Sequence, residues 1–176
     1  MGIILVIAII LLFILIFVIT QDDKNKRLLK HPNYIKVNES DLIRMSTYVG
    51  GHPNIDDQVL SVYAAKIDNN IVLFDAPTSM SPTIKIGTIP IDSIKSINIE
   101  DASSFNKKLS LGRVMLVGVF ALAWKKNVKN ENYFITIDWN DGKFDHSTIF
   151  SFEKPLISDP KNTSNKTRNK LIAICK

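Results

Sequence analysis

The chain is poor in the residues from which disulfides and metal sites are built. Its 176 residues include one cysteine, Cys175, and three histidines. A single cysteine excludes an intramolecular disulfide and a zinc site made of several thiolates. His31, His52 and His146 stand 21 and 94 residues apart, with no carboxylate at the spacing of metal ligands. We therefore expect no bound metal and no cofactor, and we interpret His52, which precedes Pro53, as a turn residue.

Signatures of catalysis and phosphate binding are missing as well. The seven glycines form neither a dinucleotide fingerprint nor a phosphate-binding loop, and no serine lies in a nucleophile elbow. The stretch Asp138-Trp-Asn-Asp-Gly142 is one residue short of the spacing of a calcium loop, and Ile149 stands where that loop needs glutamate. It predicts a hairpin turn. Asp56-Asp57 is typical of an exposed loop rather than of a catalytic dyad, so the sequence predicts that the protein is not an enzyme.

The N-terminal segment lacks polar side chains altogether. Gly2 to Ile19 is a run of 18 residues without a charge, an amide or a hydroxyl. As a helix it would reach about 27 Å, close to the hydrocarbon thickness of about 30 Å. A cleaved signal peptide is the main alternative, but there is no charged segment before the run and no small-x-small site before Gln21. We expect an uncleaved transmembrane anchor over residues 1–20, with a buried core helix as the remaining alternative.

The flanks of this run predict its orientation. No basic side chain precedes it, whereas four follow within about ten residues: Lys24, Lys26, Arg27 and Lys30. Because basic residues favour the cytoplasmic side, we expect a single-pass protein of the cell membrane with its N-terminus outside and its globular domain in the cytoplasm. Residues 21–46 read as a charged tether, with one short helix signal over Asp41 to Met45.

The rest of the chain, residues 47–176, predicts one mainly β domain. From Tyr48 onward, short apolar runs alternate with turn residues at intervals of roughly ten residues. The predicted strands cover residues 59–66, 71–75, 83–89, 95–99, 132–139 and 143–152. Asp68-Asn69-Asn70 and Asn140-Asp141-Gly142 predict two hairpin turns, because asparagine and glycine tolerate positive φ.

Periodicity also predicts which side chains reach the core. Tyr133, Ile135, Ile137 and Trp139 alternate along one strand and so share one face, which we expect to be buried. A terminal helix is expected from Asn162 or Ser164 onward, with three docking residues: Leu171, Ile172 and Cys175.

The order of these pieces resembles a known family. Tyr48-Val-Gly-Gly-His-Pro53, two hairpin strands, Ile91-Asp-Ser-Ile94, Leu111-Gly-Arg113 and Tyr133-Phe-Ile-Thr-Ile137 follow one another along the chain. This order is similar to that of small bacterial and phage proteins with a pleckstrin-homology-like (PH-like, GRAM-like) domain. The resemblance covers about residues 48–175 and implies a bent sheet or partly open barrel of seven strands, capped by the C-terminal helix. Elsewhere such folds bind phosphoinositides, other lipids or peptides, and fold alone selects none of these.

One apolar segment of the domain is flanked on both sides by basic residues, which we call the basic frame. The run from Val114 to Trp124 has no polar side chain, and residues 102–130 contain six basic residues and no acidic one. If the run is a buried strand pair, the lysines are simply solvated at its ends. If it touches the inner leaflet, Val119, Phe120 and Trp124 are the membrane contacts and the cations meet anionic head groups. The candidate lipid-binding residues are Lys107, Lys108, Arg113, Lys125, Lys126 and Lys129.

Two functions remain open on these grounds. The first is a membrane-tethered module without enzymatic activity that contacts lipid head groups, or a partner, at the inner membrane surface. The second is a structural or regulatory subunit or adaptor of a membrane protein complex, with another membrane protein as partner. Nucleic acid is not an expected partner, because the chain is tethered to a membrane.

Overall fold

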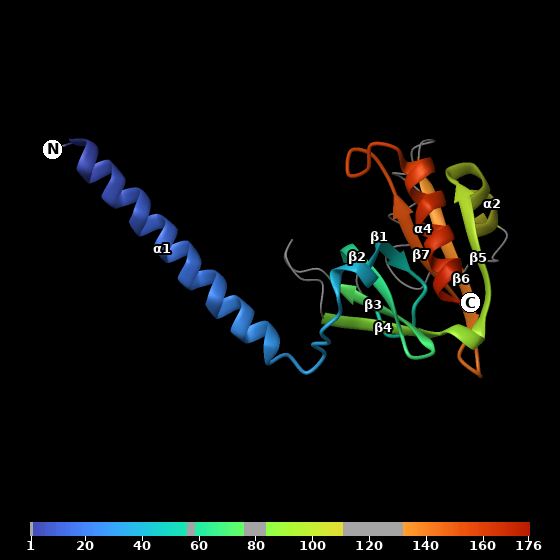
Figure 1. Cartoon of the computed structure of the whole chain (residues 1–176). Helices are drawn as coiled ribbons and strands as arrows, with labels where there is room; N and C mark the ends of the chain where they lie inside the picture. Colours follow the sequence, from blue (N-terminus) through green and yellow to red (C-terminus); the bar gives the residue numbers. More distant parts are fainter. Residues whose placement is uncertain (1, 56–58, 76–83, 111–131) are drawn as a thin grey trace. The chain divides into compact units, whose positions relative to one another are not determined.

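The computed structural model describes residues 2–55, 59–75, 84–110 and 132–176, without the side chains of 2–5, 7–8, 21–25, 27–28 and 108–110. The chain forms two compact units, Met1–Ile35 and Lys36–Lys176. The first contains helix α1 (Gly2–Leu29), and the second contains the sheet and the remaining helices (Figure 1).

Helix α1 extends past the apolar run into the charged segment that follows it. Its described apolar side chains between Val6 and Ile19 are all exposed, by 45–69%. They include eleven consecutive residues, Ile9 to Ile19, so apolar side chains are exposed on every side of this part of the helix. Within the part of the chain that the structure describes, no helix is long and apolar enough to cross a membrane. The transmembrane anchor expected over residues 1–20 stays a prediction.

The second unit is mainly β, as predicted. Its strands are β1 (Ile43–Gly50), β2 (Val59–Ile67), β3 (Asn70–Asp75), β4 (Ile84–Pro90), β5 (Ile94–Asp101), β6 (Tyr133–Asn140) and β7 (Asp145–Phe152). They form one open antiparallel sheet in the order β4-β3-β2-β1-β7-β6-β5. The first and the last strand in sequence are therefore neighbours in the middle of the sheet. Figure 1 shows β3 and β4 running across the direction of β5, β6 and β7, so the sheet is bent.

Both predicted hairpins are confirmed. Ile67 pairs with Asn70 across the turn between β2 and β3, and Asp68 in that turn has a φ of 52°. Asn140 pairs with Asp145 across the turn between β6 and β7. These turns set the register that places the alternating apolar residues of each strand on one face.

The short helix expected over Asp41 to Met45 is wrong in its greater part. A three-residue 3-10 helix, η1 (Glu39–Asp41), ends where the prediction begins, and β1 starts at Ile43. Ile43 and Met45 are buried in the core, and Ile43 pairs with Ala64 of β2. The strand forms because this burial and pairing outweigh a local helix signal of one turn.

The predicted terminal helix is α4 (Pro160–Ile174), and it begins slightly earlier than expected. The Asp159 carboxylate caps it by accepting a hydrogen bond from the Asn162 backbone N–H at 3.0 Å, and Pro160 suits the first turn because it has no N–H to satisfy. Leu171 is fully buried, and Ile172 and Cys175 pack against the core, which confirms the three docking residues.

The sheet is covered on a second face that the sequence did not indicate. Ile135, Ile137 and Trp139 are buried in the main core, as predicted, and the partly buried Tyr133 packs against it. Phe134, between them, points to the opposite face and is fully buried too. Helix α2 (Ala102–Ser110) covers it there, with the Phe105 and Phe134 rings stacked at 4.4 Å between centroids. The residues of β6 therefore contact two separate clusters.

Candidate functional site

The predicted lipid-contact residues fall mostly outside the described part of the chain. Lys107 lies on α2, where it is exposed, and Lys108 follows it on the same helix. The other predicted residues lie outside the described residues: Arg113, Val119, Phe120, Trp124, Lys125, Lys126 and Lys129. The same holds for Asp56 and Asp57. The basic frame and the two interpretations of its apolar run remain predictions.

Three aromatic rings from distant parts of the chain meet beside the β6–β7 hairpin. The Trp139 ring on β6 lies 4.7 Å from the His146 ring on β7 and 5.4 Å from the His52 ring, which follows β1 (centroid distances). The Trp139 Nε1–H donates to the Thr148 hydroxyl at 2.9 Å. His52 is only 4% exposed, so its ring is part of the packed interior, although it was expected simply as a turn residue.

The backbone around His52 explains this position. Gly51 precedes it with a φ of 87°, and a Cβ at Gly51 would lie 1.8 Å from the Ser147 carbonyl oxygen. This close approach brings the loop after β1 against β7. The Tyr48 hydroxyl accepts from the His52 backbone N–H at 3.0 Å and donates to the Ile55 carbonyl at 3.2 Å, which closes the loop. A glycine and a buried tyrosine thus hold the imidazole in place.

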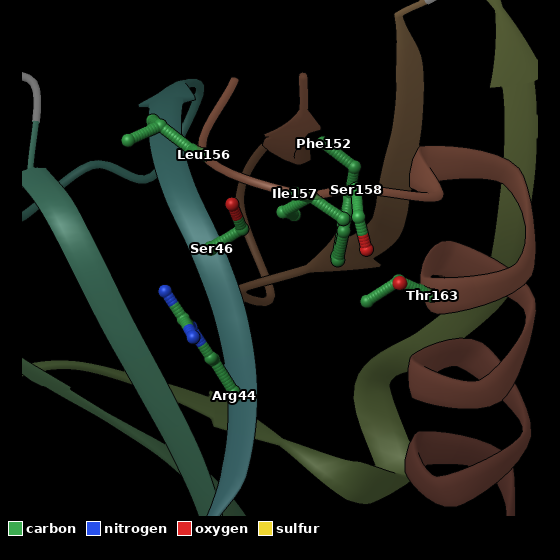
Figure 2. Close-up of a pocket in the computed structure, with 7 residues that line it drawn as sticks. All are labelled: Arg44, Ser46, Phe152, Leu156, Ile157, Ser158 and Thr163. Atoms are coloured by element: carbon green, nitrogen blue, oxygen red, sulfur yellow. The ribbon is translucent and has the colours of Figure 1, made fainter. Parts of the chain in front are cut away.

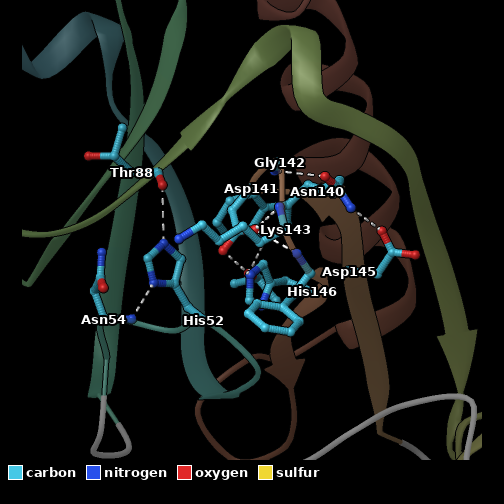
Figure 3. A network of polar contacts seen from close by, with 12 residues as sticks. His52, Asn54, Thr88, Asn140, Asp141, Gly142, Lys143, Asp145 and His146 are labelled. Atoms are coloured by element: carbon cyan, nitrogen blue, oxygen red, sulfur yellow. Dashed lines mark hydrogen bonds and ion pairs between the residues drawn. The ribbon is translucent and has the colours of Figure 1, made fainter.

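Both nitrogens of His52 are occupied (Figure 3). Nδ1 accepts from the Asn54 backbone N–H at 3.2 Å, so the proton is on Nε2, which donates to the Thr88 carbonyl at 3.2 Å. Burial lowers the pKa of His52, the hydrogen bond to Thr88 opposes this effect, and the neighbouring His146 adds to it. The geometry holds a neutral imidazole with neither nitrogen open to a ligand.

The β6–β7 turn satisfies its own polar groups in the same way. Asp141 accepts from the backbone N–H groups of Lys143 and Phe144 at 2.8 and 2.7 Å. Its second oxygen lies 2.9 Å from His146 Nε2. These contacts, the one with His146 first, hold the pKa of Asp141 well below its ordinary value. The acidic pattern that resembles a calcium loop therefore serves to fold a hairpin.

A pocket of about 220 Å³ lies on the α4 side of the sheet (Figure 2). Its lining residues come from β1, the end of β7, the segment after it and α4: Arg44, Ser46, Phe152, Leu156, Ile157, Ser158 and Thr163. Ser46 lies at a register shift of β1 and has a φ of 68°. Figure 2 shows the Thr163 side chain pointing from α4 toward β1, whereas the Arg44 guanidinium points away from α4. The volume is below the range of about 300–1,000 Å³ typical of small-molecule sites.

No constellation for metal binding is present in the ranges that the structure describes, since no group of three or more His, Cys, Asp or Glu side chains comes together there. Comparison with protein-family models, curated proteins and solved structures finds no match to this chain. The class of the protein is therefore given by its fold, a mainly β domain with an open seven-stranded antiparallel sheet and a C-terminal helix.

Proposed function

We propose that the chain is a membrane-tethered module without enzymatic activity, which works at the inner surface of the cell membrane. The observation that carries this proposal is the exposure of apolar side chains on all sides of α1, from Ile9 to Ile19. An amphipathic helix of a water-soluble domain buries one stripe and presents polar residues elsewhere. A helix that is apolar all round needs apolar surroundings on every side, and a bilayer supplies them.

The charges behind this segment support an orientation. Basic residues at positions 24, 26, 27 and 30 follow the apolar run. We therefore place the N-terminus outside and residues 36–176 in the cytoplasm. There the domain contacts the head groups of anionic lipids or docks another membrane protein.

The strand order supports a PH-like domain at the level of topology. Seven antiparallel strands form one bent sheet, with β1 beside β7, and a helix follows the last strand. The family resemblance implies a bent sheet or partly open barrel of seven strands that is capped by the C-terminal helix. It selects no ligand by itself, because one fold serves many functions.

The tether is tested by placing charge in the apolar run of the full chain. We expect the unchanged chain to float with lipid vesicles and to resist both high salt and alkaline carbonate. The variant Leu12→Arg with Leu15→Arg should leave the membrane fraction, because each arginine near the centre of a span costs about 3 kcal/mol. The matched control is Leu60→Arg with Leu156→Arg, where the same change is made at side chains 70% and 57% exposed in the second unit.

The control variant should float like the unchanged chain. Equal flotation of both variants would contradict the proposal, and so would release of the unchanged chain by carbonate. Release by salt alone would mean that the chain binds through its charges and that α1 is no anchor.

A further inference from the structure

One half of α4 is exposed, and its charges have one sign. The exposed positions of the helix fall on a single side, at the spacing that a helix of 3.6 residues per turn predicts. They carry three lysines and three asparagines: Lys161, Asn162, Asn165, Lys166, Asn169 and Lys170. Residues 160–176 include no aspartate or glutamate. We call the exposed side chains of 161–176 the α4 face.

The lysines of the α4 face have no acidic partner among the described residues. This differs from Lys95, whose ammonium group pairs with Asp145. The nearest carboxylate in sequence, Asp159, is engaged at the N-terminus of the helix with the Asn162 backbone N–H. The positive charge of this face is therefore not neutralised within the described part of the protein.

The opposite side of α4 fixes the orientation of this face. Leu171 is fully buried, and the Thr167 hydroxyl donates to the Arg44 carbonyl at 3.4 Å. Arg168 Nε donates to the Ile97 carbonyl on β5 at 2.7 Å. These contacts hold the helix against the sheet, so the lysines project from a rigid support and need no ordering of the backbone when they bind.

We propose that the α4 face rests on anionic lipid head groups, an inference that depends on the proposed tether. The helical part of the face extends about 18 Å from Lys161 to Ala173. It presents ammonium and amide donors and, apart from Ala173, no apolar side chain, so it suits a contact on the bilayer surface rather than insertion into it.

The chemistry of the cations favours a lipid surface over a structured anion. Arginine is the residue that reads phosphates of fixed geometry through two parallel hydrogen bonds. The one arginine of α4, Arg168, is turned inward to β5. Lysines act as point charges, and mobile head groups can match their positions without a shaped site. The tether keeps such a surface at high effective concentration, so that a weak contact suffices.

The test uses the full chain in vesicles, with a spin label at Ala173→Cys in a Cys175→Ser background. Lipids carrying a chelated nickel ion in the head group report proximity by relaxing the label. In vesicles rich in phosphatidylglycerol we expect a relaxation enhancement several-fold larger than in pure phosphatidylcholine, and we expect salt to abolish the difference. A label at Leu60→Cys in the same background should show no such dependence on lipid charge.

Two matched charge variants identify the face. Lys161→Gln, Lys166→Gln and Lys170→Gln together should reduce the enhancement to its value in phosphatidylcholine. The control Lys36→Gln, Lys85→Gln and Lys143→Gln removes the same net charge elsewhere and should leave the enhancement unchanged.

Several outcomes would overturn the inference. Equal effects of the two triple variants would mean that net charge, and not this face, is responsible. A label at position 173 that responds to an added acidic polypeptide or polynucleotide, but not to anionic vesicles, would assign the face to another partner. If the chain floats with vesicles and the label still detects no lipid, the inference fails while the tether stands. If the chain does not float, the proposed function itself fails.

Discussion

Replacing one Hα of Gly51 by a methyl group tests the close approach of this residue to the backbone of β7. At Gly51, with a φ of 87°, a Cβ would lie 1.8 Å from the Ser147 carbonyl oxygen. Because that neighbour is backbone, Gly51→Ala must move β7 or the loop that holds His52. We expect the free energy of unfolding to fall by more than about 3 kcal/mol in urea titrations.

Gly142 supplies the control for this substitution. Its φ of 94° is similar, but a Cβ there meets nothing within 4 Å. Gly142→Ala should therefore cost only the left-handed strain of about 1–2 kcal/mol. If both alanine variants lose the same free energy of unfolding, the close approach of Gly51 to Ser147 adds no cost beyond the left-handed strain.

The imidazole held behind Gly51 predicts how stability depends on pH. Burial lowers the pKa of His52 in the folded protein below its ordinary value of 6.5. Between these two pKa values the unfolded chain binds more protons, so the free energy of unfolding rises with pH. We expect stability to be lost as the pH falls below about 6.5 and to be restored above it. Thermal unfolding across this range measures the slope.

Two histidine variants separate the contribution of His52 from the rest of the chain. His52→Gln, whatever its overall stability, should flatten the pH dependence, because its side chain does not titrate. His31→Gln changes an exposed histidine and should leave the slope as it is. A slope that survives in His52→Gln would assign the dependence to another group.

At the scale of elements, the sequence was informative where structure is local. The hairpins β2–β3 and β6–β7 were predictable because their turn residues and alternating apolar residues lie within a few positions of one another. Helix α2 was not, because Ala102–Ser110 has few apolar residues and depends on Phe105 stacking with Phe134 of β6. The start of β1 was not predicted, because Ile43 pairs with β2, a strand that is distant in sequence.

Phe105 is the side chain through which α2 covers the sheet, and its removal tests this element. It is fully buried and stacks on Phe134 at 4.4 Å between ring centroids. Phe105→Ala leaves a cavity between α2 and β6, which typically costs about 3–5 kcal/mol. Urea unfolding should show this loss, together with faster amide hydrogen exchange in α2.

The control for Phe105 is Phe144 in the β6–β7 turn, which is 66% exposed. Phe144→Ala should change the free energy of unfolding by less than about 0.5 kcal/mol. If Phe105→Ala were equally mild, α2 would not be a stabilising part of the fold.

At the scale of the whole molecule, the distribution of charge along the sequence was easier to predict than the surface on which the charges gather. The excess of basic residues in the last third of the chain, thirteen against six acidic ones over residues 102–176, can be counted directly. The direction of the α4 face could not be predicted from the sequence. The buried side of the helix includes Ser164 and Thr167, which hydrophobic periodicity assigns to solvent. The cluster of the His52, Trp139 and His146 rings could not be predicted either, since 94 residues separate its two histidines.

The orientation of the whole chain in the membrane depends on a few basic residues beside the apolar run. A reporter that is active only outside the cell, fused after Lys176, should give no signal, because the basic residues that follow the apolar run hold the domain in the cytoplasm. Changing Lys24, Lys26, Arg27 and Lys30 to glutamine and inserting two lysines after Met1 reverses the bias, and the reporter should then become active. The control Lys161→Gln, Lys166→Gln and Lys170→Gln removes charge far beyond the roughly 15–20 residues that count for orientation, so it should leave the reporter silent. A reporter that is active outside in the unchanged chain would invert the proposed orientation and place the α4 face against the outer leaflet.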